Sequence, residues 1–184
     1  MPEEQRENIF TELLKFALFA VIIVVPVRLF VAQPFIVSGA SMDPTFDNGQ
    51  YLIVDELTYR FDDPNRGDVI IFKYPKDPSQ YFIKRVIGLP NETIRITNGG
   101  VSITKEDGSS VALDEKYVTN EGNGGNLNVT LKSDEYFVMG DNRPESSDSR
   151  LWGVLPRENI VGRALLRLLP IASASLLPGS TPAE

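Results

Sequence analysis

A serine in a turn-forming string is the first residue of this chain that could do chemistry. Ser41 lies within residues 38–45, in a chain that has no histidine and no cysteine. A Ser-His-Asp triad, a thiolate nucleophile and a Cys/His zinc site are therefore all excluded. If Ser41 is a nucleophile, its base must be a carboxylate, the N-terminal amine or a lysine. The amine lies beyond a long apolar run, whereas Lys84 is available within residues 82–90.

Lys84 can take a proton from a serine only while its amine is neutral. Its reference pKa is about 10.4, so work near pH 8 requires a drop of about 2 units, which is about 3 kcal/mol. Burial among apolar groups can supply that shift. On a strand, Phe82, Lys84 and Val86 share one face while Arg85 points to the other. The alternatives are a strand-edge lysine that discourages aggregation and a turn serine, neither with a catalytic role.

Four strings, in order, resemble the signature boxes of type I signal peptidases, the membrane-bound serine/lysine proteases that remove signal peptides. They cover residues 38–45, 66–72, 83–90 and 139–150. The resemblance implies that Ser41 is the nucleophile and Lys84 the general base. It implies no metal and no organic cofactor.

The resemblance also implies groups that support this pair. Ser146 would hydrogen-bond the Lys84 amine and orient it towards Ser41. The oxyanion would be held by the Ser41 backbone N–H and a second donor near Gly39, because this chain has glycine where one branch of the family has a donor serine. Losing such a donor costs about 3 kcal/mol where it is used.

Charged residues of the last string complete the implied site. The resemblance makes Asp148 and Arg150 a structural ion pair that shapes one wall, with Asp141 and Arg143 fixing the same loop. The alternative is a solvated loop that serves only as scaffold.

Apolar residues precede both members of the pair and indicate where a substrate would bind. Two extended segments side by side can hold a peptide between them as a β-strand. The resulting shallow pockets would favour alanine and other small residues, as in the Ala-x-Ala sites of signal peptides. The residues expected to contact substrate are Phe35, Val37, Met42, Phe82 and Ile83.

Residues 13–32 form an apolar run that is long enough to cross a bilayer. The alternative is a cleaved secretory signal. Arg6 and Lys15 lie on its N-terminal side, while residues 33–59 contain no lysine or arginine. The positive-inside rule therefore predicts one pass through the cell membrane, with the N-terminus in the cytoplasm and the body on the extracytoplasmic side.

Length and composition limit the remaining possibilities. A chain of 184 residues with 42% hydrophobic residues is enough for one compact unit. The net charge of −7 argues against a nucleic-acid partner. The expected partners are signal peptides of exported preproteins and the lipid bilayer, and the expected state is a monomer.

The body reads as β-structure. Short β-branched runs separated by turn clusters predict strands at residues 51–54, 68–73, 81–87, 93–97, 101–104, 127–131 and 136–139, with a short helix near residues 156–160. The expected fold class is mainly β: an antiparallel β-sheet catalytic body with a small inserted β lobe, preceded by one N-terminal transmembrane helix. The expected divisions are a cytoplasmic N-terminus 1–12, an anchor 13–32, a catalytic body 33–91 and 135–170, an inserted lobe 92–134 and a flexible tail 171–184.

The sequence thus predicts a membrane-anchored serine endopeptidase that uses a Ser/Lys dyad to cleave signal peptides after small residues. Two rivals remain open. A self-cleaving Ser/Lys repressor-type protease fits poorly with the apolar run and the lack of an N-terminal DNA-binding module. A membrane-anchored β domain that only binds peptides would keep the apolar groove but would need no buried lysine.

Overall fold

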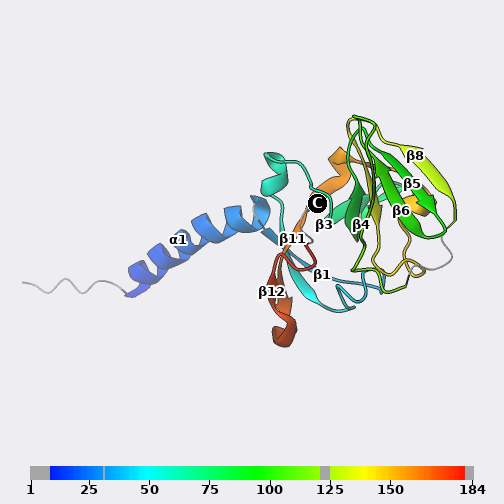
Figure 1. Ribbon diagram of the computed structural model, residues 1–184. Coiled ribbons are helices and arrows are strands. Elements are labelled where there is room, and N and C mark those ends of the chain that lie inside the picture. The colour runs from blue at the N-terminus through cyan, green and yellow to red at the C-terminus, as the bar shows by residue number, and fades with distance from the viewer. Residues whose placement is uncertain (1–8, 31, 121–124, 181–184) are drawn as a thin grey trace, which may run out of the picture.

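The computed structural model describes residues 9–30, 32–120 and 125–180. Helix α1 (Ile9–Phe30) leads into the β body and extends away from it (Figure 1). Within the described residues, no helix is long and apolar enough to cross a membrane. Part of the segment expected to be an anchor lies outside this description, namely residue 31 and the side chains of residues 23, 25–30 and 32.

The body is built on one large antiparallel sheet with the strand order β1-β2-β11-β3-β4-β9-β10, and β12 pairs with β11. Its strands are β1 (Ala32–Ile36), β2 (Tyr51–Asp55), β3 (Val69–Tyr74), β4 (Asp77–Gly88), β9 (Glu135–Met139), β10 (Leu155–Pro156), β11 (Ile160–Leu169) and β12 (Ser175–Leu176). The prediction of a mainly β, antiparallel fold is confirmed.

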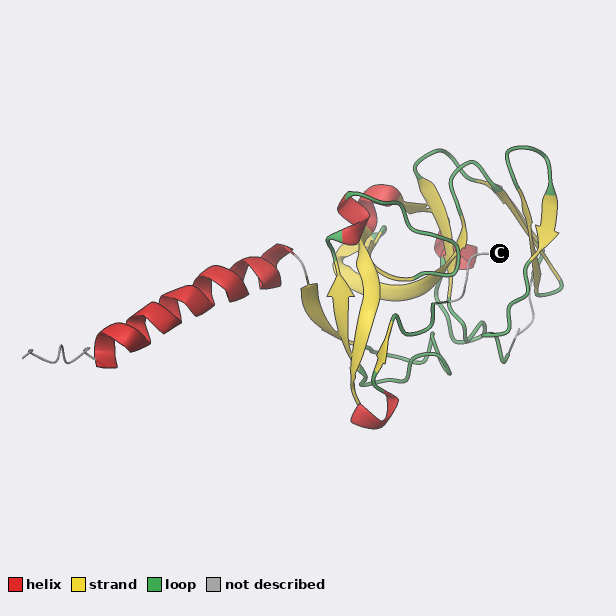
Figure 2. Ribbon diagram, turned by 60° about the vertical axis from the view of Figure 1, so that its left-hand side comes forward, coloured by secondary structure: helices red, strands yellow, loops and turns green. Residues whose placement is uncertain are grey.

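A second sheet lies beside the first, on the side of the body away from α1 (Figures 1 and 2). Its strand order is β7-β6-β5-β8. The strands are β5 (Thr93–Thr97), β6 (Gly100–Thr104), β7 (Ser110–Ala112) and β8 (Leu127–Thr130). All of them come from the chain between β4 and β9.

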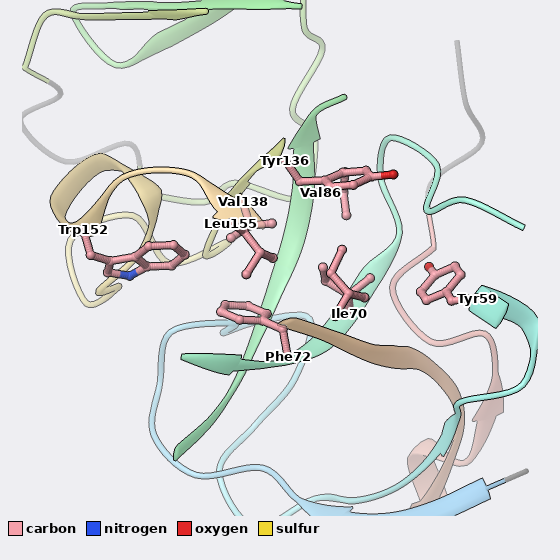
Figure 3. Close-up of a cluster of buried hydrophobic side chains, with 9 residues drawn as sticks. Tyr59, Ile70, Phe72, Val86, Tyr136, Val138, Trp152 and Leu155 are labelled. Atoms are coloured by element: carbon pink, nitrogen blue, oxygen red, sulfur yellow. The ribbon is translucent and has the colours of Figure 1, made fainter. Parts of the chain in front are cut away.

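Strand β3 is buried on both faces and divides the core of the large sheet. Ile70 and Phe72 point into a cluster that also holds Val86 and Trp152 (Figure 3). Val69 and Ile71 point the other way, into a second cluster. This second cluster also holds Val37, Met42 and Phe46 of the loop that follows β1. Each large apolar side chain buried in this way contributes about 1.5–3 kcal/mol. The strand is therefore a rigid support for β4, its neighbour.

A third cluster joins the two sheets. It packs Ile87 of β4 and Phe137 of β9 against Ile94 of β5 and Ile103 of β6. The small sheet is therefore packed against the carboxyl end of β4 and against its neighbour β9.

The C-terminal part of the chain differs from the sequence-based expectation. Strand β11 was not predicted, although it lies in the sheet between β2 and β3. The expected helix near residues 156–160 is only the 3-10 turn η2 (Arg157–Asn159), which ends where β11 begins. Residues 171–180, for which a flexible tail was expected, instead form the turn η3 (Ile171–Ser173) and β12.

Candidate active site

Ser41 and Lys84 are brought together from segments that are far apart in sequence. Lys84 lies in β4, which is paired with β3 on one side and β9 on the other. Ser41 lies in the loop between β1 and β2. The Lys84 Nζ donates to Ser41 Oγ at 2.7 Å and to the Ile83 carbonyl at 2.8 Å. A lysine amine in this position can accept the proton of the hydroxyl once it is itself neutral.

The surroundings of Lys84 favour the neutral amine. The residue is only 4% exposed, and the Phe82 ring lies 5.4 Å from Nζ. Burial lowers the pKa of Lys84 from 10.5 to about 8, against the opposing attraction of the Asp148 and Asp141 carboxylates. A large fraction of the protein therefore holds an uncharged amine beside the Ser41 hydroxyl at mildly alkaline pH.

Ser146 does not make the contact that the resemblance implied. Its Oγ is buried and has no hydrogen-bond partner among the described residues, so the expected bond to Lys84 is absent. The hydroxyl lies instead beside Gly140, and a Cβ added at Gly140 would clash with both Ser146 Oγ and the Ser41 carbonyl. Sequence reasoning missed Gly140, although it lies within the last of the four strings.

Asp148 and Arg150 form an ion pair at the start of α2 (Ser149–Trp152). The Arg150 Nε and Nη2 donate to the two Asp148 carboxylate oxygens, each at 2.8 Å. Asp148 is fully buried and also accepts from the Gly140 N–H at 3.0 Å. Arg150 Nη2 donates in addition to the Arg143 carbonyl at 2.6 Å. The pair therefore ties α2 to the backbone beside Ser41.

A second buried ion pair joins β4 to the segment that follows β9, and a hydrogen bond ties the loop that holds Ser41 to the same pair. The Arg85 guanidinium donates to Asp141 through Nε at 2.9 Å and Nη2 at 2.6 Å, and both side chains are almost fully buried. Thr45 Oγ1 donates to the same carboxylate at 2.5 Å. Arg143 pairs separately with Glu115. Sequence reasoning assigned Asp141 to the site but missed Arg85 and Glu115, which had no recognisable spacing to their partners.

The backbone around the nucleophile is held by hydrogen bonds on both sides. Gly39 has a φ of +93°, which favours glycine, and its N–H donates to Asn48 Oδ1 at 2.9 Å. The Ser41 carbonyl accepts from the Asn142 N–H at 3.1 Å, and the Asn142 side chain donates to the Ala40 carbonyl at 3.1 Å. A second donor to the oxyanion was expected near Gly39. The N–H of Gly39 itself already donates to the Asn48 side chain.

A cleft of about 280 Å³ opens beside the pair. Four of the five residues expected to contact substrate line it: Phe35, Val37, Phe82 and Ile83. Met42 does not, because it is 1% exposed and belongs to the second cluster. Among the described residues, no three side chains of the metal-binding types come together, so this part of the chain offers no ready metal site.

Comparison with known proteins identifies the family of this chain. A model of the family described as signal peptidase, peptidase S26, matches residues 10–169. The chain belongs to this family. Probable signal peptidase I-2 of Synechocystis sp. is 36% identical over 95% of this chain and 80% of its own length, and signal peptidase I of Aquifex aeolicus is 32% identical over 91% and 86%. A solved signal peptidase I from Enterococcus faecalis is 31% identical and covers 55% of this chain and 97% of its own, with a TM-score of 0.47.

Membership of this family makes the protein a hydrolase of the protease class. The rival interpretation as a β domain that only binds peptides is thereby set aside.

Proposed function

We propose that this enzyme removes signal peptides from exported preproteins by means of a Ser41/Lys84 dyad. The observation that carries the proposal is the 2.7 Å contact between Lys84 Nζ and Ser41 Oγ, made by a buried lysine. Its lowered pKa, about 8, gives the amine the basicity that the reaction needs without keeping it charged.

The reaction begins with the neutral Lys84 amine taking the hydroxyl proton as Ser41 Oγ attacks the scissile carbonyl. The tetrahedral intermediate collapses when the Lys84 ammonium gives that proton to the leaving amine, which leaves an ester on Ser41. Lys84 then takes a proton from water as the water oxygen attacks the ester. The bond between the acyl carbon and Ser41 Oγ breaks, the Lys84 ammonium returns its proton to Ser41 Oγ, and the carboxyl product leaves. The Ser41 backbone N–H is the proposed donor to the oxyanion.

Neighbouring residues act by position rather than by contact with substrate. Asp148, paired with Arg150, accepts from the Gly140 N–H, and because Gly140 has no Cβ, Ser146 Oγ and the Ser41 carbonyl can both approach it. We assign these four residues to positioning of the dyad. Asp141 has the same role through Arg85, on the neighbouring position of β4.

The cleft beside the dyad supports cleavage after small residues. Val37 and Ile83 are apolar and both line the cleft, as do the aromatic residues Phe35 and Phe82. An extended peptide between β1 and β4 would place the first and third side chains before its scissile bond against these residues. Such walls accept alanine more readily than a large or charged residue, which fits an Ala-x-Ala site.

We further propose that α1 attaches the enzyme to the cell membrane, with the N-terminus in the cytoplasm and the body outside. Ile9, Phe10 and Phe16 are 78%, 75% and 73% exposed, so this helix presents large apolar side chains that need apolar surroundings. Both members of the dyad come from one chain, so the proposed reaction needs no second copy, and the proposed state is a monomer. The proposed units remain residues 1–12, 13–32, 33–91 with 135–170, 92–134 and 171–184.

Cleavage of a preprotein with an Ala-x-Ala site, in detergent, tests the proposal. Ser41→Ala and Lys84→Met should each abolish cleavage and also labelling by a serine-reactive acylating probe. The matched controls Ser110→Ala and Lys105→Met change exposed residues near the second sheet and should keep both activities. Cleavage at the wild-type rate by either dyad variant would show that the chemistry lies elsewhere.

A further inference from the structure

A second cavity, of about 330 Å³, lies next to the active-site cleft and has a different chemical character. It is lined by charged and polar side chains, among them Glu56, Arg60, Lys73 and Glu158. Tyr81 lines both cavities, so the two are adjacent on the sheet. The proposed reaction uses none of these charged groups.

The second cavity lies on the α1 side of the cleft. Gln33 of β1 lines the second cavity, whereas Phe35, further along β1, and Val37, just beyond its end, line the cleft. On β4, Tyr81 likewise precedes Lys84. Along both strands the path from the end of α1 towards Ser41 therefore passes the second cavity first.

Glu56 is the group that indicates a ligand. Its Oε1 is buried and accepts no hydrogen bond from any described residue. Burial raises the pKa of Glu56, while the charges of Arg60 and Lys73 oppose that rise. A buried carboxylate oxygen without a donor is costly, and a donor supplied by a ligand would remove that cost. Glu56 lines the cavity, so a change of rotamer that turns its carboxylate towards the cavity brings Oε1 within reach of a ligand donor.

Lys73 supplies a complementary donor. It is exposed, it lines the same cavity, and it is the cross-strand partner of Tyr81. A ligand group that donates to Glu56 and accepts from Lys73 would satisfy both. A carboxamide does so with one planar group, because its NH₂ donates and its carbonyl accepts.

We propose that this cavity is a polar subsite for a glutamine or asparagine side chain of the signal peptide, upstream of the scissile bond. The inference rests on the proposed function. If α1 lies in the membrane, the apolar part of a signal peptide must also approach from that side. Residues N-terminal to the scissile bond would then cross the second cavity.

Strand geometry specifies the position. Gln33 precedes Val37 by four residues, which is about 13 Å along a strand. An extended substrate covers the same distance in four residues. Side chains of a strand alternate between faces, so a substrate whose residues −1 and −3 point into the cleft also points −5 towards the sheet. The subsite therefore reads residue −5, counting the residue before the scissile bond as −1.

Three preproteins test the subsite, identical except for Gln at −5, Leu at −5, or Leu at −5 with Gln at −4. Wild-type enzyme should cleave the Gln(−5) substrate with a kcat/KM about fivefold above that of Leu(−5), the effect of about one hydrogen bond, and Gln(−4) should bring no gain. The fivefold preference should fall to about one in Glu56→Leu and in Lys73→Met. The ratio is taken within each variant, so a general loss of activity cancels. Glu106→Gln, an exposed control outside both cavities, should keep the preference.

Three results would overturn the subsite: a wild-type ratio of kcat/KM for Gln(−5) over Leu(−5) near one, an equal gain from Gln at −4, or a preference that survives both Glu56→Leu and Lys73→Met. Cleavage of the preproteins would still support the proposed function in each case. Failure of the wild-type enzyme to cleave any of the three preproteins would overturn the proposed function, and the subsite with it.

Discussion

Replacing Lys84 by methionine should change the stability of the protein in a pH-dependent way. Its pKa falls from 10.5 to about 8 on folding because the amine is buried. A shift of about 2.5 units corresponds to about 3 kcal/mol. Since Lys84 is only 4% exposed, solvent screening removes little of this. The charged amine therefore destabilises the folded state at neutral pH.

The sign follows from proton binding. Between pH 8 and 10.5 the unfolded chain holds the Lys84 proton and the folded protein does not, so the free energy of unfolding contributed by this group rises with pH. The full penalty is present below pH 8 and is gone above 10.5. Methionine carries no such penalty. The stability of Lys84→Met relative to wild type should therefore be greatest below pH 8 and decline by about 3 kcal/mol towards pH 10.5.

Denaturant unfolding of both proteins in the same detergent at pH 7, 8, 9 and 10 measures this difference. Other titrating groups cancel in the comparison, and the lost hydrogen bonds to Ser41 and Ile83 add a constant offset. Lys105→Met, which removes an exposed lysine, is measured in parallel as the matched control. A difference for Lys84→Met that stays constant with pH would refute the lowered pKa.

Three further substitutions test the support of the site. Arg150→Ala should lower the free energy of unfolding by about 2–3 kcal/mol and reduce cleavage, because it leaves the Asp148 carboxylate buried without its cation; an unchanged melting temperature with full activity would contradict this. Gly140→Ala should reduce kcat at least tenfold and destabilise by about 1–3 kcal/mol, since the added methyl meets the Ser41 carbonyl; wild-type kinetics would show that the contact relaxes freely. Met42→Ala should cost about 2–5 kcal/mol of stability because Met42 is a core residue; a changed cleavage-site preference in a stable variant would restore it to the substrate cleft.

The strands that sequence reasoning located are those with short runs between clear turns. β5 (Thr93–Thr97) was predicted to the residue, and β3 and β4 to within a few residues. β11 was missed because the adjacent apolar residues Leu165 and Leu166 break the apolar–polar alternation of the sequence, and the strand pairs with β2 through register shifts. Its place in the sheet is fixed by distant partners, which a local pattern cannot report.

The candidate site shows the same division. Ser41 and Lys84 could be named from residue types and from the strings around them, because few alternatives exist in a chain without histidine or cysteine. Arg85 pairs with Asp141 and also donates a hydrogen bond to the Gly179 carbonyl near the C-terminus. Both contacts depend on how the chain folds back on itself. Met42 was assigned to the cleft because it adjoins the nucleophile in sequence, but its side chain turns into the core.

In the proposed reaction a neutral Lys84 activates Ser41, so the rate of Ser41 acylation should depend on pH as the fraction of neutral Lys84 does. The second-order rate constant for the serine-reactive probe can be followed by intact mass between pH 6 and 10. This rate constant should rise tenfold per pH unit at low pH and level off with a midpoint of about 8, the lowered pKa of Lys84. A rate constant that still rises at pH 10, or one that does not change with pH, would contradict it.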